Sequence, residues 1–414
     1  MTEEKITEWI NEVYSTVPLY INYAGEARRE IRNTAAMPII RKQDFVDAQD
    51  GCINPEYYIK YMRNELMTVQ TSGSTGHYLQ IMWDKSNYHC SMAELWLRRI
   101  KYHGIYPHNR LAYFFTDNDN TGSYISKENE FGIPKTRLMP EYIDNSYDHI
   151  MDWNPEWMLL QPSTAVLLTE YVRRKNKPVP ASLRYIELSG EVLTDEVREM
   201  LKETFGCEVA NQYGANEVNS VAYECPEGNM HVMTSNVYVE IVDDKNKLLC
   251  DSIKKGECEE SGRIILTSLT NKAMPFIRYD IGDIGAISWK ICPCGCKNPV
   301  LRLYGGRNND FIFVDEHNRI SPYVFVSIFD RINNFYDGAI VQFYIEQLRY
   351  ELFEIKILAD EELDKEEIIR SFRECLNTDF LIRAKYNIEF VKEPINTGVG
   401  GKYAYFRNRI NKVG

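Results

Sequence analysis

The start of the chain has the hydrophobic spacing of an amphipathic helix. Ile6, Trp9, Ile10 and Val13 recur at intervals of three and four residues. Residues at this spacing fall on one face of a helix. We therefore predict that the chain begins with a helix. The sequence contains neither an internal repeat nor a low-complexity stretch.

From about residue 110, short apolar runs alternate with polar loops and a helical pattern. Strands are predicted over residues 111–115, 157–160, 184–188 and about 207–210. A helix is predicted between the last two, with Thr194 as N-cap and Gly206 as C-cap. The apolar face of this helix consists of Val197, Met200, Leu201 and Phe205.

Strands that alternate with helices predict a parallel sheet with right-handed crossovers. Ligands of such sheets bind at the carboxyl ends of the strands. The segment Ser189-Gly190-Glu191 follows one predicted strand, and residues 211–217 follow the next. We therefore expect a ligand site at this edge of the sheet.

Beyond residue 231 the alternation of strands and helices gives way to a β-rich region. Residues 237–242 and 262–267 are predicted strands of this region. After Arg307 a smaller α/β unit is predicted, with strands near residues 311–314, 353–358 and 386–391. A chain of 414 residues is too long for one ordinary core. We expect two or three folded units, with a boundary at about residues 307–310.

Composition narrows the class of protein. Hydrophobic residues make up 44% and charged residues 26% of the chain, as in soluble globular proteins. The net charge of -12 argues against a nucleic-acid-binding surface. The sequence has no apolar run long enough to span a membrane and no secretory signal. A cytoplasmic protein is expected, and its ten cysteines are interpreted as reduced thiols or metal ligands.

Residues 71–76 carry the sharpest local signal for chemistry. The segment reads Thr71, Ser72, Gly73, Ser74, Thr75 and Gly76. Glycines let the backbone approach an anion closely, and the hydroxyls can donate to phosphate oxygens. The segment is not a Walker A loop, because His77 and a predicted strand follow it. The alternative is a flexible hairpin turn.

Three further residues have types and positions that suit a nucleotide site. Asp283 follows a glycine turn, where a carboxylate can accept both hydroxyls of a ribose. Arg307 lies beside the predicted boundary, and Lys402 lies on a glycine-rich loop. Each of them alone is more often an ordinary surface residue.

The order and spacing of these motifs resemble the adenylate-forming superfamily, which includes acyl-CoA synthetases, adenylation domains and luciferases. The phenylacetate-CoA ligase branch is most similar, from about residue 68 to the end. The matches are residues 71–76 for the phosphate loop, Gly190, Glu191, Asn211, Gln212, Tyr213, Gly214, Asn216 and Glu217 for the adenine and metal motif, Asp283 for the ribose, Arg307 and Asn309 for the hinge, and Lys402 for the C-terminal lysine.

The resemblance implies an α/β fold. Residues 1–306 would form a large N-terminal domain of parallel and mixed sheets with helices and a β-rich subdomain. Residues 307–310 would form a hinge, and residues 311–414 a small mobile α+β domain. The implied reaction joins a carboxylic acid to AMP from ATP and releases pyrophosphate. The acyl group then passes to a thiol of CoA or of a phosphopantetheine carrier protein.

The resemblance also assigns roles to single residues. Glu217 would hold Mg²⁺ and Tyr213 would stack on adenine. Asp283, assisted by Arg307, would bind the ribose hydroxyls. Lys402 would bridge the substrate carboxylate and the α-phosphate.

Three departures from the family pattern keep alternatives open. His77 replaces a lysine after the phosphate loop, Asn216 replaces a threonine or serine, and Asn309 takes the place of the hinge aspartate. One alternative is an adenylate-binding protein with little or no turnover, and another is adenylation with an amine acceptor. The oligomeric state stays open, with a homodimer as one option.

A second constellation consists of cysteines and a histidine. Thiolates with an imidazole suit tetrahedral Zn²⁺, and the predicted ligands are Cys225, His231, Cys292 and Cys294, with Cys296 as the substitute. We expect a structural metal. The alternatives are packed cysteines and a zinc module for protein interaction.

The resemblance favours an aromatic acid as the substrate. The segment near residues 131–140 is expected to form loops that line the acid pocket, with turns at Gly132 and Pro134. An amino acid would need a buried carboxylate for its ammonium group. Residues 188–190 and 211–216 contain no aspartate, and Glu191 is assigned to the nucleotide.

Replacing Lys402 with Ala is expected to slow acyl-adenylate formation by about two to three orders of magnitude, because one charge partner of the transition state is lost. Thioester formation from a presynthesised adenylate should change much less. Single-turnover kinetics of the two half-reactions measure both effects, and equal damage to both would contradict the assigned role.

Overall fold

The computed structural model describes residues 2–24, 37–70, 79–115, 123–138, 142–254, 260–304, 312–316, 319–320, 322, 325, 328–329, 331–332, 335–336, 340–359, 364–376, 379–392, 395 and 405–410. The described residues form two compact units, one up to Leu303 and one from Tyr304 onward. The hinge predicted at residues 307–310 lies outside the described residues, so the domain limits stay a prediction.

The first unit contains helices, short 3-10 turns and strands. Its α-helices are α1 (Glu3–Thr16), α2 (Pro18–Ala24), α3 (Lys42–Ala48), α4 (Tyr58–Met62), α5 (Lys85–His103), α6 (Ile143–Trp153), α7 (Pro162–Lys175) and α8 (Asp195–Phe205). Its 3-10 turns are η2 (Gln49–Cys52), η3 (Pro55–Tyr57) and η4 (Lys135–Leu138).

The strands of this unit are β1 (Met67–Gln70), β2 (Gln80–Trp83), β3 (Leu111–Phe115), β4 (Ile125–Ser126), β5 (Glu130–Pro134), β6 (Trp157–Leu160), β7 (Tyr185–Ser189), β8 (Glu208–Ala215), β9 (Asn219–Glu224), β10 (Met230–Val232), β11 (Val237–Val242), β12 (Leu248–Asp251), β13 (Gly262–Ser268), β14 (Tyr279–Ser288) and β15 (Val300–Leu303). β1 and β2 form an antiparallel pair.

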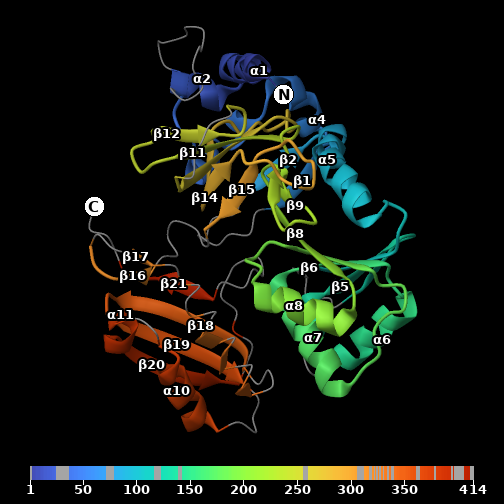
Figure 1. The fold of residues 1–414 in the computed structure, drawn as a ribbon. Coiled ribbons are helices and arrows are strands. Elements are labelled where there is room, and N and C mark those ends of the chain that lie inside the picture. Colours follow the sequence, from blue (N-terminus) through green and yellow to red (C-terminus); the bar gives the residue numbers. More distant parts are fainter. Residues whose placement is uncertain are drawn as a thin grey trace. The chain divides into compact units, whose positions relative to one another are not determined.

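The other strands form one sheet with the order β12-β11-β13-β14-β15-β10-β9-β8-β7-β6-β3-β5-β4 (Figure 1). The strands β5, β3, β6, β7 and β8 pair in parallel. From β8 onward the pairing turns antiparallel. The α/β fold class predicted from the sequence is confirmed.

Helices cover both faces of the parallel strands, which explains why these strands are apolar along their length. Apolar residues of α6, α7 and α8 pack on one face, with Ile186 and Leu188 of β7 in the same cluster. Tyr185 of β7 packs on the other face with Trp96 of α5. Successive residues of β7 therefore pack in two different hydrophobic cores, one on each face of the sheet.

The predicted helix caps are present in α8. The Thr194 hydroxyl accepts a hydrogen bond from the Val197 amide at 3.2 Å, which satisfies a backbone donor of the first turn. Gly206 has a φ of 63°, a conformation that glycine adopts without strain. Leu201 and Phe205 are buried. The predicted helix is confirmed.

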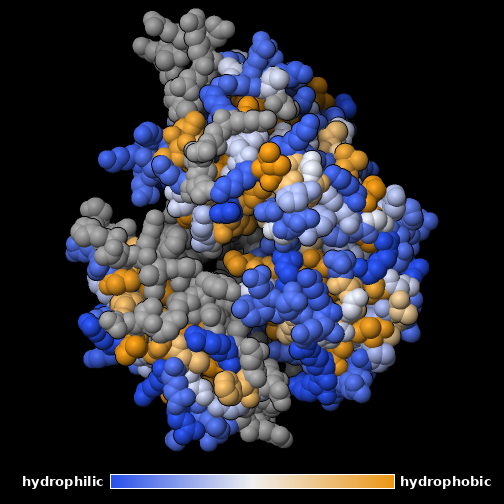
Figure 2. All heavy atoms as spheres, viewed as in Figure 1, coloured by the Kyte–Doolittle hydropathy of each residue, from blue (hydrophilic) through white to orange (hydrophobic). Residues whose placement is uncertain are grey.

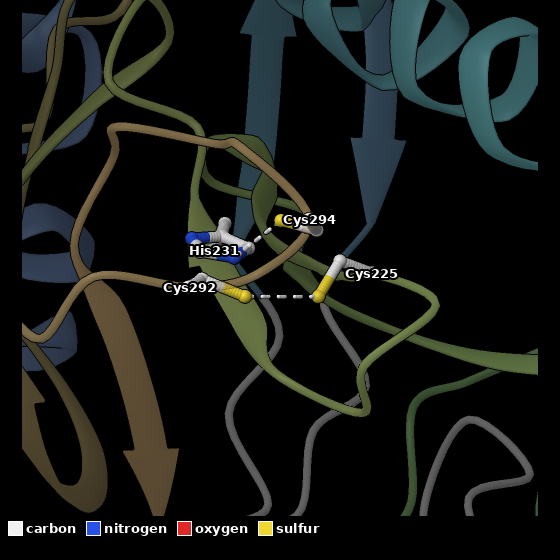
Figure 3. Close-up of side chains that lie close together, drawn as sticks. All are labelled: Cys225, His231, Cys292 and Cys294. Carbon is white, nitrogen blue, oxygen red and sulfur yellow. Dashed lines mark hydrogen bonds between the residues drawn. The ribbon is translucent and has the colours of Figure 1, made fainter.

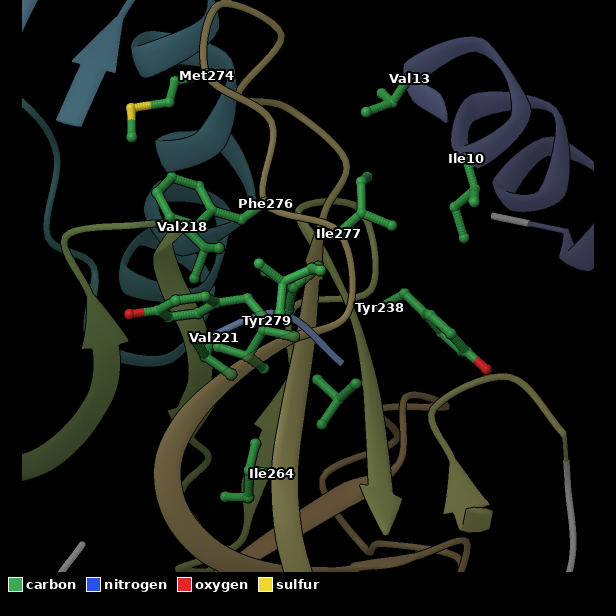
Figure 4. Packing of buried hydrophobic residues seen from close by; sticks show 14 of the residues in the cluster. Ile10, Val13, Val218, Val221, Tyr238, Ile264, Met274, Phe276, Ile277 and Tyr279 are labelled. Carbon is green, nitrogen blue, oxygen red and sulfur yellow. The ribbon is translucent and has the colours of Figure 1, made fainter. Parts of the chain in front are cut away.

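The N-terminal helix packs on the β-rich part of the first unit. Ile10 and Val13 of α1 are buried with Ile277 and Tyr279 in one cluster (Figure 4). The indole nitrogen of Trp9 donates to the Ser268 carbonyl at 2.9 Å. The helix predicted from the hydrophobic spacing is confirmed, and its apolar face belongs to the largest core.

Two predicted loops are wrong. Residues 130–134 form the strand β5 rather than turns, because pairing with β3 supplies their backbone hydrogen bonds. A side-chain carbon on Gly132 would lie 2.8 Å from the Tyr113 ring, so this glycine makes room for an aromatic neighbour. The strand predicted to end at Ala210 continues to Ala215 as β8, because β9 folds back along it.

The second unit has a smaller sheet and its own core. Its elements are β16 (Ile312–Phe313), β17 (Arg319–Ile320), β18 (Ile340–Arg349), β19 (Leu352–Ala359), α10 (Lys365–Glu374), α11 (Asp379–Arg383), β20 (Lys385–Val391) and β21 (Phe406–Asn408). Four strands pair in the order β20-β19-β18-β21. Ile368 and Phe372 of α10 pack in this core. The strands predicted near residues 353–358 and 386–391 correspond to β19 and β20.

Exposed apolar side chains are distributed over several elements. They include Met62 on α4, Leu97 on α5 and Ile382 on α11. The face seen in Figure 2 mixes hydrophobic and hydrophilic side chains, as protein surfaces commonly do. Among the described residues, every helix is too short or too polar to cross a lipid bilayer.

A buried ion pair joins α5 to the middle of the parallel strands. Arg99 donates to both carboxylate oxygens of Glu187, at 2.8 and 2.5 Å. Glu187 is fully buried and Arg99 is 4% exposed. The Tyr185 hydroxyl also donates to Glu187, at 3.1 Å. Breaking such a pair leaves a charge without its partner in the interior.

Replacing Arg99 with Met is expected to cost about 3–5 kcal/mol of unfolding free energy, because Glu187 loses its buried partner. A double variant that also carries Glu187→Leu should recover most of this loss. Urea unfolding followed by tryptophan fluorescence measures it, since all six tryptophans precede residue 304. The exposed pair of Arg173 and Glu203 is the control, where Arg173→Met should cost less than about 1 kcal/mol. A double variant as unstable as the single one would contradict this account.

Candidate functional site

The carboxyl ends of β7 and β8 bring two predicted site segments side by side. Ser189 pairs with Gln212 in the parallel register of the two strands. The Ser189 hydroxyl also donates to the side-chain oxygen of Gln212. Gly190 and Glu191 follow directly on β7, and Tyr213 follows Gln212 on β8. Both segments therefore lie at one edge of the sheet.

Gly190 has both a conformational and a spatial reason to be glycine. Its φ is 87°, and a side-chain carbon there would lie 3.2 Å from the Gln161 amide nitrogen. Gln161 follows β6 and is the N-cap of α7. The exposed Gly190 backbone and the partly buried Gln161 side chain therefore share this edge.

The motif at residues 211–217 runs up one strand of a hairpin. β8 continues to Ala215, residues 216–218 form the turn, and Asn219 begins β9 with a φ of 61°. A side-chain carbon on Gly214 would lie 2.6 Å from the Asn219 carbonyl oxygen. The close approach of the two strands therefore requires glycine at position 214.

The hairpin turn carries Glu217 into the protein interior. Glu217 is 7% exposed, and one carboxylate oxygen accepts a hydrogen bond from the Tyr279 hydroxyl at 3.0 Å. The neighbouring Asn216 is exposed, and its backbone carbonyl accepts from the Trp83 indole nitrogen at 3.2 Å. The turn is thus held by β2 and by β14.

Asp283 reaches Tyr213 because β14 bulges. The ladder between β13 and β14 passes from the pair Ile265–Asp280 to the pair Arg263–Ile284, so residues 281–283 bulge out of β14. Gly282 in this bulge has a φ of 83°, and bulges re-aim side chains in this way. The Tyr213 hydroxyl donates to Asp283 Oδ2 at 2.6 Å.

The structure thus brings several predicted residues together on the hairpin and β14. Tyr279 was missed by sequence reasoning, although it lies four residues before Asp283 in the same segment. Residues 71–76, His77, Arg307, Asn309 and Lys402 lie outside the described residues, and their roles stay predictions. The flanking strands β1 and β2 pair antiparallel.

The chain is similar in sequence to several known proteins. No family model matches the chain. The phenylacetate-coenzyme A ligase of Thermus thermophilus is 26% identical over 331 residues, 76% of this chain and 71% of that protein. Protein CapK of Staphylococcus aureus is 23% identical over 435 residues, 97% of this chain and 85% of that protein.

Solved structures of low sequence identity share the fold. A 2-hydroxyisobutyryl-CoA ligase in complex with 2-HIB-AMP has a TM-score of 0.71 at 16% identity, covering 99% of this chain and 90% of that one. An anthranilate CoA ligase in complex with anthranoyl-AMP has a TM-score of 0.57 at 18% identity, covering 82% and 65%.

Over most of its length the chain is similar to phenylacetate-coenzyme A ligases, and it shares its fold with CoA ligases that form acyl-AMP. The resemblance inferred from the sequence is thereby confirmed. The roles of single residues do not follow from this similarity and are proposed below.

The chain also has a group of three cysteines and one histidine, of which Cys225, His231 and Cys292 are buried and Cys294 is partly buried. One ligand atom each from Cys225, His231, Cys292 and Cys294 lies within 4.8 Å of the others (Figure 3). The sulfurs of Cys225 and Cys292 are 3.7 Å apart. The Cys294 sulfur is 3.3 Å from His231 Nε2. In a tetrahedral zinc site with Zn–S bonds of about 2.3 Å and Zn–N bonds of about 2.0 Å, two sulfur ligands lie about 3.8 Å apart, and a sulfur and a nitrogen ligand about 3.5 Å apart.

Two similar turns present the cysteines. Cys225 begins the turn Cys-Pro-Glu-Gly and Cys292 the turn Cys-Pro-Cys-Gly. In each turn the glycine amide donates to the first cysteine carbonyl, at 2.9 Å for Gly228 and 3.1 Å for Gly295. Both glycines have positive φ, 74° and 77°. The repeated turn geometry points both cysteine sulfurs inward.

His231 is oriented by its other ring nitrogen. Nδ1 lies 2.9 Å from the Asn298 carbonyl oxygen, so a proton on Nδ1 leaves the Nε2 lone pair directed at the cluster. Burial lowers the pKa of His231, but the Cys296 sulfur and the Asn298 carbonyl together raise it to about 9, so a metal bound at Nε2 would have to displace the proton that this nitrogen otherwise carries. The Cys296 sulfur accepts a hydrogen bond from Arg98 at 2.9 Å. Cys296 also interacts with His231, but it is not one of the four residues whose ligand atoms all lie within 4.8 Å of one another.

Proposed function

We propose that the protein activates a carboxylic acid with ATP and passes the acyl group to coenzyme A. In the first step a carboxylate oxygen attacks the α-phosphorus, and the bond to the bridging oxygen breaks as pyrophosphate leaves. In the second step the thiolate of coenzyme A attacks the acyl carbon and AMP leaves. The observation that carries the proposal is the pair of contacts that join the β8–β9 hairpin to β14.

These contacts suit a nucleotide with its metal ion. Asp283 uses Oδ2 to accept from Tyr213, which aims its carboxylate at the edge where a ribose would lie. Tyr213 is partly buried, and its ring, held by that bond, offers a surface for adenine. The buried Glu217 carboxylate fits Mg²⁺, which prefers oxygen ligands. Bound there, Mg²⁺ would neutralise phosphate charge.

Coenzyme A is proposed as the acceptor because several relatives and structural neighbours are named as CoA ligases. A carrier protein would offer the same thiol at the end of phosphopantetheine. The acid is proposed to be aromatic, in line with the phenylacetate-specific names of several relatives.

Pyrophosphate exchange tests the first step. Wild-type protein with ATP and Mg²⁺ should exchange labelled pyrophosphate in the presence of arylacetate or benzoate-type acids. Glu217→Gln should lower the rate by about 100-fold or more, because a charged ligand near the phosphates becomes neutral. Glu208→Gln is the matched control, since Glu208 is an exposed carboxylate at the start of β8, the strand that leads to the turn with Glu217.

Exchange with an α-amino acid and with none of the aryl acids would contradict the aromatic assignment. Binding of ATP without exchange for any acid would favour an adenylate-binding protein. Product analysis with coenzyme A, with a carrier protein and with hydroxylamine separates thiol from amine acceptors.

We also propose that Cys225, His231, Cys292 and Cys294 hold a structural Zn²⁺. Support comes from the donor set, the separations near tetrahedral values and the orientation of His231. Four protein ligands leave no open coordination position. The ion would join the turn after β9 to the loop between β14 and β15.

Protein purified without chelators is expected to contain about one zinc per chain, measured by elemental analysis. Cys292→Ser should lower the zinc content and the melting temperature, because metal binding contributes to folding free energy. Cys90→Ser is the control, since Cys90 is exposed and lies on α5. A zinc-free preparation with an unchanged melting temperature after chelation would end the proposal.

A further inference from the structure

Lys135 and Gln161 form a polar pair at the carboxyl edge of the parallel strands. Lys135 directly follows β5, and Gln161 directly follows β6. The Lys135 ammonium donates a hydrogen bond to the side-chain oxygen of Gln161. β3 lies between β5 and β6 in the sheet, so the two side chains together bridge about 10 Å, two strand spacings. The bridge therefore passes over the end of β3.

This pair continues into the segments already described. The Gln161 amide nitrogen lies against Gly190, 3.2 Å from the position of a side-chain carbon. Next to it, the Ser189 hydroxyl donates to Gln212. Lys135, Gln161, Ser189 and Gln212 are all partly buried. We call these four side chains the polar row.

The polar row restricts which acids fit beside it. An unsubstituted phenyl ring against the row would cover amide and ammonium groups without offering them hydrogen bonds, and such desolvation is costly. An acid with its own acceptor oxygens would offer these groups further hydrogen bonds. Since an ammonium ion is the strongest donor of the row, a negatively charged group suits it best.

We propose that Lys135 and Gln161 bind a second carboxylate on the acid substrate, at the end of the molecule away from the reacting carboxylate. This inference rests on the proposed function and names the substrate class within it: aromatic acids that carry a further anionic group. Lys135 then acts as a specificity-determining residue, and Gln161 holds its ammonium group over the end of β3.

Pyrophosphate exchange with paired acids tests the proposal. The acids are phenylacetate, 4-hydroxyphenylacetate and 4-carboxyphenylacetate, each with wild type and with Lys135→Met. Wild type should use 4-carboxyphenylacetate with a kcat/KM about 100-fold above that for phenylacetate, because sites built for polar contacts reject analogues that lack them. Lys135→Met should remove this preference by lowering kcat/KM for the dicarboxylate, with phenylacetate changed less than about threefold.

Two further variants serve as controls. Lys135→Arg keeps the positive charge and should keep much of the preference. Lys127→Met removes a lysine whose ammonium contacts Glu130 at 3.3 Å and whose side chain is 65% exposed. It should leave all three rates unchanged.

The outcomes separate the inference from the proposed function. Exchange with phenylacetate that equals or exceeds exchange with the dicarboxylate would overturn the inference and leave the proposed function standing. An equal loss of kcat/KM for all three acids in Lys135→Met would also overturn it. Lys135 would then contact a group that all three acids share, or would support folding. Absence of exchange with every acid in the wild type would overturn both.

Discussion

A carboxylate that is buried away from water needs hydrogen-bond partners in the protein. The buried carboxylate of Glu217 therefore constrains the conformation of the hairpin between β8 and β9. The turn must point inward rather than into solvent, so Trp83 and Tyr279 hold it from two sides. The strands must approach closely, so position 214 has no side chain. Once the turn is fixed in this way, Tyr213 lies on a strand whose position is set at both ends.

The same hairpin links the proposed nucleotide site to the cysteine group. Glu224 is the last residue of β9. Its carboxylate accepts a hydrogen bond from the backbone amide of Asn211 at 2.6 Å and another from the Arg198 guanidinium at 2.7 Å. The next residue is Cys225. One carboxylate therefore fixes the start of the 211–217 motif, and the adjacent residue supplies a proposed metal ligand. Arg198 lies on α8, so the helix after Gly190 takes part in the same contact.

Sequence reasoning succeeded where a local pattern determines a local structure. The N-terminal helix follows from the spacing of Ile6, Ile10 and Val13, and α8 from its caps. The cysteine group could be anticipated because its residue types have few other uses together. The family resemblance could be recognised because motif order survives where overall identity is low.

The remaining features depend on contacts between distant residues. β8 extends past Ala210 because β9 supplies hydrogen bonds, and nothing in Asn211 or Gln212 indicates a strand. Asp283 meets Tyr213 through a bulge that a window of sequence does not reveal. Lys135 and Gln161 are 26 positions apart, and they become neighbours through the strand order of the sheet.

The double pairing of β8 has a consequence for folding fidelity. This strand runs parallel to β7 and antiparallel to β9. A slip of one residue would turn every side chain of β8 to the opposite face. Tyr213 would then point away from Asp283, and Gln212 away from Ser189. The bulge beside Gly214 and the left-handed Asn219 oppose such a slip, because each fits one alignment of the two strands. Gly214 and Asn219, which lie beside residues proposed to bind the nucleotide, thus also fix the register of the sheet that carries them.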